Sequence, residues 1–223
     1  MKKSVMLLSL FGIQVVLPMF MMYAPKKILS IDDVRPFYKA EDESLILPGD
    51  HLDYMDPIVF EQISNEWPSL SKLQISDTSL SEIPATIGLL RNLKYLNLHD
   101  WRNLTTLPST IANLTNLKKL RIYKRRFSKP FILPEATWQL SSLEELITSG
   151  LAQDKLPEEI ANLHNLKHLI LENSQIKSLP ESISDMKKLE WINVRNTPLV
   201  RLKSWSVIRS TIENNIPEIS FDE

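Results

Sequence analysis

The sequence predicts an α/β solenoid of about six stacked repeats, with curved parallel strands on a concave face, short helical or 3₁₀ segments on a convex face, and a cap at each end. Two observations support this prediction. The apolar residues and the proline of residues 107–122 return at the same spacing in residues 156–171. In addition, the prolines at 84, 108, 134, 157 and 180 lie 24, 26, 23 and 23 residues apart, a period typical of repeat proteins.

Each half of the repeat has the spacing of one kind of secondary structure. Leu169 and Leu171 are two residues apart, so in an extended strand they point to one side while Ile170 points to the other. The Ile-x-x-Leu-x-x-Leu portion has a three-residue spacing, which suits a helical or 3₁₀ turn. One such unit cannot bury its own apolar face, so neighbouring units must stack. We therefore expect strands around residues 73–75, 96–98, 120–122, 146–148, 169–171 and 192–194.

The repeat also resembles a known family. Residues 107–122 read LPSTIANLTNLKKLRI and residues 156–171 read LPEEIANLHNLKHLIL. Both are similar to leucine-rich repeats of 23 residues with an LPxxIxxLxxLxxLxLxxNxL frame, and the resemblance covers roughly residues 63–202. It implies a scaffold that binds other molecules, but it does not identify them. The family's asparagine-ladder position holds Thr78, Ser174 and Thr197, so the ladder is formed at best by hydroxyl groups here, or it is interrupted.

Four segments are expected along the chain. They are a signal peptide or signal anchor at 1–24, an N-terminal lead-in and cap at 25–69, the leucine-rich repeats at 70–202, and a C-terminal cap at 203–223. Within the lead-in, residues 25–43 carry no periodicity and are expected to form a tether or to pack loosely, whereas residues 56–65 are expected to be helical. Caps are needed because the end repeats of a solenoid otherwise expose their apolar core.

The N-terminus has the pattern of a targeting segment. Lys2 and Lys3 precede an apolar run from Val5 to Tyr23, which matches a charged region followed by the hydrophobic part of a signal sequence. A cleaved signal is the first interpretation. A retained membrane anchor is the second, because the run approaches the length of a bilayer span, and a buried or cytosolic segment is the third.

The composition excludes several classes of function. Lys and Arg number 26 against 27 Asp and Glu, so no overall positive field favours nucleic acid. No cysteine is present to form disulfides or thiolate metal sites, and four glycines are too few for the glycine-rich phosphate loops. His99 and His168 are expected on the exposed strand face, three strands and about 14 Å apart, too far to share a metal ion. We therefore expect no catalytic residue, no metal and no cofactor.

The exposed side of the strands is the predicted binding site. Aligning the repeats places Ile147 and Ile170 side by side, bordered by Tyr123, His168 and Trp191. An apolar centre inside a polar rim is typical of a binding patch, although β-branched residues also simply favour strands. The other four tryptophans are expected in the core or the caps. The predicted partner-binding residues are Tyr95, Asn97, His99, Lys119, Arg121, Tyr123, Ile147, His168, Ile170, Trp191, Asn193 and Arg195.

A basic stretch from Lys118 to Lys129 is the strongest local charge cluster. It predicts either a solvated loop or a contact with an acidic partner, such as an acidic protein, a glycan or a lipid headgroup. The acidic pair Glu144 and Glu145 is expected to be solvated.

Together these features predict a non-enzymatic module that binds a protein or peptide, secreted or in the cell envelope, with a membrane contact only through an uncleaved N-terminus. A cytoplasmic signalling or scaffold protein is the alternative.

Overall fold

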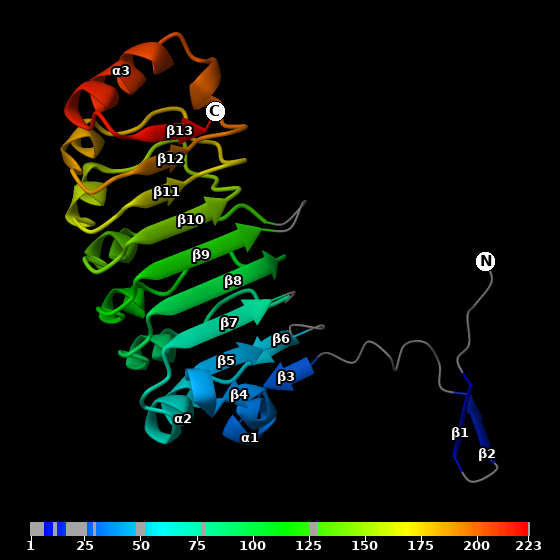
Figure 1. Cartoon of the computed structure of the whole chain (residues 1–223). Coiled ribbons are helices and arrows are strands. Elements are labelled where there is room, and N and C mark those ends of the chain that lie inside the picture. The colour runs from blue at the N-terminus through cyan, green and yellow to red at the C-terminus, as the bar shows by residue number, and fades with distance from the viewer. Residues whose placement is uncertain are drawn as a thin grey trace.

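The computed structural model describes residues 7–10, 13–16, 26–28, 30–47, 52–76, 79–124 and 129–222. Within these ranges the main feature is a nine-stranded sheet in the order β13-β12-β11-β10-β9-β8-β7-β5-β4, stacked along the long axis of the solenoid (Figure 1). All neighbouring strands are parallel except β4 and β5. The strands are β4 (Tyr38–Lys39), β5 (Ser44–Leu47), β7 (Lys72–Ser76), β8 (Tyr95–Trp101), β9 (Lys119–Lys124), β10 (Glu145–Ser149), β11 (His168–Ile170), β12 (Trp191–Asn193) and β13 (Ser220–Asp222).

The register of this sheet agrees with the alignment of the repeats. Lys72 pairs with Tyr95, Tyr95 with Lys119, and Lys119 with Glu145. Glu145 in turn pairs with His168, and His168 with Trp191. Each predicted strand segment therefore falls on an observed strand, and equivalent residues of successive repeats lie beside one another. The sheet also continues past both predicted ends, through β5 on one side and β13 on the other.

Short 3₁₀ helices return the chain from one strand to the next. Each of the five is preceded by a proline, and its first hydrogen bond runs to that proline's carbonyl, as from Ile111 N to Pro108 O at 3.0 Å. Proline fits this place because its fixed φ suits a helical start and no helical N–H is lost there. These segments are η4 (Ala85–Leu89), η5 (Ser109–Asn113), η6 (Glu135–Gln139), η7 (Glu158–Asn162) and η8 (Glu181–Asp185).

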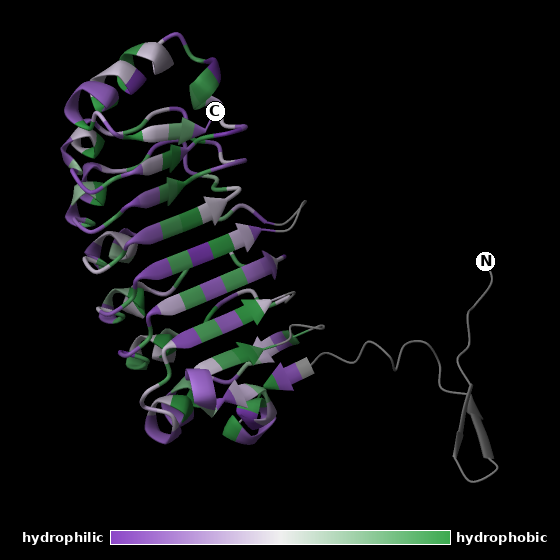
Figure 2. Ribbon diagram, in the orientation of Figure 1, coloured by the Kyte–Doolittle hydropathy of each residue, from purple (hydrophilic) through white to green (hydrophobic). Residues whose placement is uncertain are grey.

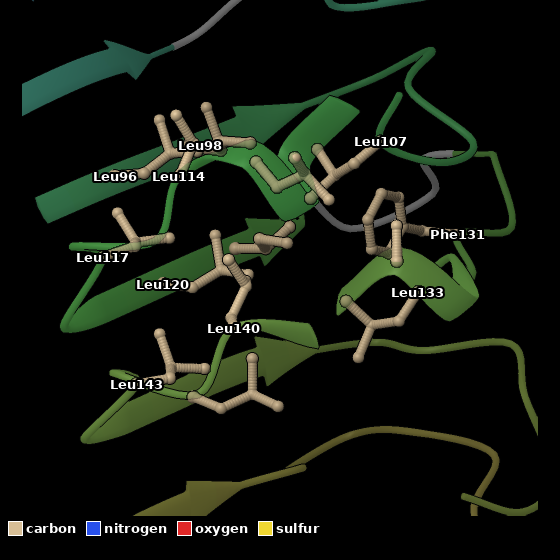
Figure 3. Close-up of a cluster of buried hydrophobic side chains, with 14 of the residues drawn as sticks. Leu96, Leu98, Leu107, Leu114, Leu117, Leu120, Phe131, Leu133, Leu140 and Leu143 are labelled. Atoms are coloured by element: carbon tan, nitrogen blue, oxygen red, sulfur yellow. The ribbon is translucent and has the colours of Figure 1, made fainter. Parts of the chain in front are cut away.

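Leucine and isoleucine side chains from strands and 3₁₀ helices fill the space between them. Leu169 and Leu171 are fully buried while Ile170 is only half-buried, as the two-residue alternation requires. Along the strands in Figure 2, apolar and polar residues alternate. Figure 3 shows Leu96, Leu117, Leu120 and Leu143 from successive repeats stacked in one continuous cluster. The core is therefore shared between repeats, as a solenoid requires.

Residues with left-handed backbone lie at or just beyond the ends of four strands. Asp100 near the end of β8, and Gly150, Asn173 and Asn196 after β10, β11 and β12, have φ values between 57° and 78°. Asn, Asp and Gly adopt this conformation most readily. The sharp exit from the strand thus explains these residue types at this point of the repeat.

The hydroxyl ladder inferred from the sequence is present only in part. Ser174 is fully buried, and its Oγ accepts a hydrogen bond of 3.0 Å from Leu151 N in the preceding repeat. The hydroxyl of Thr197 instead donates to Val194 O in its own turn, at 2.7 Å. Thr78 lies outside the described residues. Ser174 therefore links two repeats, whereas Thr197 does not.

The expectation of a loosely packed lead-in is wrong for the described part of residues 25–43. β3 (Lys26–Ile28) pairs with β6 (Leu52–Met55), and α1 (Ile31–Val34) follows. Val34 is fully buried, and the backbone N–H of Ile31 donates to Gln62 of α2 (Ile58–Glu66) at 2.8 Å. A few apolar anchors are enough to dock this segment, although they form no periodic pattern.

The predicted helix at residues 56–65 is confirmed as α2 (Ile58–Glu66), with Phe60 and Ile63 fully buried. At the other end, η9 (Leu199–Arg201) and α3 (Trp205–Asn215) precede β13. Trp205 of α3 is buried and meets the ring of Phe221 edge-on, with centroids 5.7 Å apart. β13 was not predicted, because three residues without a repeat frame give no strand signal.

The described residues of the N-terminal segment form two short antiparallel strands, β1 (Leu7–Leu10) and β2 (Ile13–Val16). The rest of the predicted signal peptide or anchor, residues 1–24, lies outside the described residues. Within the described ranges, no helix is long and apolar enough to cross a membrane.

The alternation along β11 gives a stability test. Leu169→Ala removes a fully buried side chain and should lower the free energy of unfolding by about 2 to 5 kcal/mol. Ile170→Ala removes a half-buried one and should cost far less. Urea unfolding of both variants checks this, and equal losses would show that the two sides of the strand are wrongly assigned.

Candidate functional site on the concave face

The outward side of β7 to β12, here called the concave face, holds the predicted partner-binding residues in three columns. His99 and Tyr123 share the third column with Arg195, which lies just beyond β12. The first column runs through Lys72, Tyr95, Lys119, Glu145, His168 and Trp191, and the second through Gln74, Asn97, Arg121, Ile147, Ile170 and Asn193. The columns bring together residues that are 23 to 26 positions apart in the sequence.

Most of these side chains are accessible, but two of the predicted contact residues are buried. Ile147 is 7% exposed and Asn193 is 6% exposed. Ile147 does not belong to the hydrophobic core cluster and lies in register between Arg121 and Ile170, so neighbouring side chains of the concave face cover it. The Oδ1 of Asn193 accepts a hydrogen bond from Arg195 N at 3.0 Å, which turns the amide toward its own backbone. The predicted pair of exposed isoleucines is therefore reduced to Ile170.

The remaining predicted residues are accessible to different degrees. Arg195 is exposed and Tyr95 is 37% exposed. The half-buried ones are Asn97, Lys119, Tyr123, His168, Ile170 and Trp191, and the side chains of Arg121 and His99 are 39% and 46% exposed.

Glu145 is the main feature of this face that sequence reasoning missed. Its carboxylate is 9% exposed and accepts a short hydrogen bond from Arg121 Nε. Lys119 Nζ lies 3.5 Å from Oε2, and His168 Nδ1 lies 3.9 Å from the same oxygen. We call these four residues the Glu145 cluster. The expectation that Glu145 is solvated is wrong, because cationic side chains from β9 and the His168 ring of β11 close around it.

The electrostatics of the cluster favour the carboxylate. Burial alone would raise the pKa of Glu145, but the hydrogen bond and charge of Arg121 and the charge of Lys119 outweigh it. The pKa of Glu145 therefore lies below its ordinary value. Moving Arg121 or Lys119 away would leave the nearly buried Glu145 carboxylate without a compensating charge, which is unfavourable. The carboxylate therefore keeps both cations in defined positions.

Several cations of the basic stretch from Lys118 to Lys129 already have partners within the chain. Lys118 Nζ pairs with Glu144 at 2.8 Å, and Lys124 Nζ donates to Gly150 O at 3.3 Å. Burial lowers the pKa of Lys124. Residues 125–128 lie outside the described residues. Acidic neighbours on the next strand thus offset much of the charge on Lys118, Lys119 and Arg121.

Two aromatic pairs lie on the concave face. His99 and Tyr123 have ring centroids 5.5 Å apart, and the rings of His168 and Trp191 meet edge-on at 6.0 Å. His168 Nε2 also lies 3.7 Å from Glu190. The other tryptophans are buried in the core or at the ends of the solenoid, as expected, with exposures of 8% or less. Trp191 is therefore the tryptophan that a partner on this face would contact.

A hollow of about 280 Å³ opens on the concave face across β5, β7, β8 and β9. We call it the concave hollow. Part of it could not be predicted, because β5 lies outside the recognised repeats. Its lining residues are Asp42, Ser44, Leu45, Ile46, Lys72, Leu73, Gln74, Tyr95, Leu96, Asn97, Lys119 and Arg121.

The described part of the chain contains no group of three or more His, Cys, Asp or Glu side chains placed to hold a metal ion.

Comparison with known proteins supports the fold. No family model and no curated protein matches the chain. A leucine-rich-repeat protein of Leptospira interrogans is 27% identical with a TM-score of 0.61, and the match covers 78% of this chain and 43% of that one. The leucine-rich-repeat domain of the type III effector XopL is 26% identical with a TM-score of 0.60, covering 76% and 60%. The plant peptide hormone receptor RGFR1, in complex with RGF2, is 23% identical with a TM-score of 0.52, covering 77% and 30%.

The repeat pattern, the parallel sheet and these structural neighbours identify the chain as a leucine-rich-repeat protein. The 23-residue repeat type stays a prediction. The chain spans less than two thirds of the length of each of these neighbours.

The Glu145 cluster predicts a pH-dependent contribution to stability. Because the pKa of Glu145 in the folded chain lies below the value of about 4.3 in an unfolded chain, its carboxylate stabilises the fold above that value and loses the effect as pH falls through the folded pKa. Glu145→Gln should therefore lower the unfolding free energy by about 1 to 2 kcal/mol at pH 7.

The cost of the same substitution should be smaller at pH 3 than at pH 7, because the unfolded chain is then largely protonated at this position and the advantage of the lowered pKa is reduced. Urea unfolding at both pH values measures the difference. Glu144→Gln is the matched control, because Glu144 is more exposed and pairs with Lys118, and its effect should be smaller. A Glu145→Gln effect that is the same at pH 7 and pH 3 would contradict the charge network.

Proposed function

We propose that this protein is a non-enzymatic binding module that holds a segment of a protein partner, or a peptide, on its concave face. The observation that supports this most is that two ring pairs lie in register on adjacent parallel strands of this face, His99 with Tyr123 and His168 with Trp191, with their side chains partly accessible. The opposite side of the same strands is closed by the core. Only one side of the sheet is available to a partner.

The dimensions of this face suit such a partner. Six strands spaced by about 4.8 Å span roughly 24 Å, which is enough for an extended peptide or the edge of a domain. Aromatic and arginine side chains most often dominate the energy of protein interfaces. Arg121 adds a guanidinium that Glu145 holds in a defined position. The receptor RGFR1, which shares this fold, has been solved in complex with RGF2.

A location outside the cytoplasm is part of the proposal. It is supported by Lys2 and Lys3 before the apolar run of residues 5–23, the pattern of a signal segment. The contrasting proposal is an intracellular scaffold, and XopL, a type III effector, shows that the fold also occurs in a different setting.

Alanine substitutions on the two faces test the function. A partner captured from the source cells with the full chain would be titrated against purified variants. Trp191→Ala and Tyr95→Ala should each weaken binding by more than about 1 kcal/mol, or roughly fivefold.

Glu159→Ala is the control, because Glu159 is exposed on η7, away from the strands, and its affinity should stay within twofold of wild type. Loss of binding in Glu159→Ala, with both concave variants unchanged, would place the contact surface on the convex side and overturn the proposal.

A further inference from the structure

The charge lining the concave hollow is mostly positive. Lys72, Lys119 and Arg121 line it, against one carboxylate, Asp42. Asp42 lies 3.8 Å from Lys72 Nζ and also accepts a hydrogen bond from Ser44 Oγ. The cationic side chains remain 35% to 45% exposed despite their ion pairs. Carboxylates of a bound molecule can therefore reach them.

Glu145 fixes the positions of two of these cations, Lys119 and Arg121. It contacts both of them, and its own side chain is almost inaccessible. A guanidinium whose Nε is already bonded is held in one orientation with its other N–H groups available, so less conformational freedom is lost on binding.

The rest of the lining favours a peptide rather than a lone anion. Ile46 and Tyr95 are 39% and 37% exposed, so an occupant gains apolar contact there. Asn97 Nδ2 donates to Gln74 Oε1 at 3.3 Å, while Asn97 Oδ1 is buried with no hydrogen-bond partner in the described part of the chain. This oxygen can accept from an N–H group of an extended main chain only once the Asn97 side chain turns toward the hollow.

Single-stranded nucleic acid fits the hollow less well. Successive bases need successive rings on which to stack, and Tyr95 is the one aromatic ring among the described lining residues. The chain as a whole also has a formal net charge of −1, so no general field attracts a polyanion.

We propose that the concave hollow binds an acidic segment of a protein partner, with carboxylates at Lys72, Lys119 and Arg121 and an aliphatic side chain against Ile46 and Tyr95. This inference rests on the proposed function of the concave face and specifies the chemistry of the partner there.

A peptide selection tests the proposal. Phage-displayed random linear dodecapeptides are selected on the immobilised full chain, and the enriched sequences are resynthesised and titrated. We expect enrichment of Asp and Glu next to aliphatic residues. Lys72→Glu should weaken these peptides at least tenfold, and raising NaCl from 50 to 300 mM should weaken them further, since exposed charge contacts are screened by salt.

Lys167→Glu is a closely matched control. Lys167 is 44% exposed and lies 3.8 Å from Glu190, and Lys72 is 45% exposed and lies 3.8 Å from Asp42. Lys167 does not line the hollow, so its variant should bind within twofold of wild type. Circular dichroism checks that each variant is folded, and Lys72→Gln replaces Lys72→Glu if the latter unfolds.

Any of the following results would overturn the proposal of an acidic ligand. Non-acidic peptides that lose binding in Trp191→Ala but not in Lys72→Glu would leave the concave-face function standing and reject the acidic ligand. Peptides indifferent to both variants would reject both proposals. A library without binders, or tighter binding of a thymidine 20-mer that depends on Lys72, would also reject the acidic-peptide site.

Discussion

The structure depends on one constraint: a single repeat cannot bury its own apolar face, so each repeat must use its neighbours. Parallel hydrogen bonding from β5 to β13 meets this constraint by setting equivalent residues side by side. Leu169 can then pack on the leucines of the adjacent repeats, and stability passes along the stack instead of residing in one central core. Left-handed residues at Asp100, Gly150, Asn173 and Asn196 mark where four of these strands give way to the return segment.

The same register that builds the core also assembles the concave face. Because side chains alternate along a strand, fixing Leu120 and Ile122 inward turns Arg121 outward, where it meets Glu145 of the next strand. Lys119 and Arg121 therefore serve both the stability of the sheet and the positive side of the concave hollow.

Much of this could be predicted from the sequence, and the failures have physical reasons. Because the Leu-x-Leu frame is periodic, the strands, their register and the residues that point into the core were predicted correctly. Alternation tells which side a residue faces, but it does not tell whether long neighbours cover it, which is why Ile147 and Glu145 are buried on the open face. Val34 and β13 were missed because an isolated apolar anchor and a strand outside the repeat frame show no period. The concave hollow includes Ile46 of β5, outside the repeat frame.

The central claim is that register places one side of the sheet in the core and leaves the other open, and tryptophan fluorescence measures it directly. Trp67, Trp101, Trp138 and Trp205 are at most 8% exposed, whereas Trp191 is half-buried on the concave face. Acrylamide quenching of the folded chain should therefore show one accessible population of indole emission, and Trp191→Phe should remove it. Quenching that is unchanged in Trp191→Phe would contradict the account, because the accessible tryptophan would then be one of the four assigned to the core or to the ends of the solenoid.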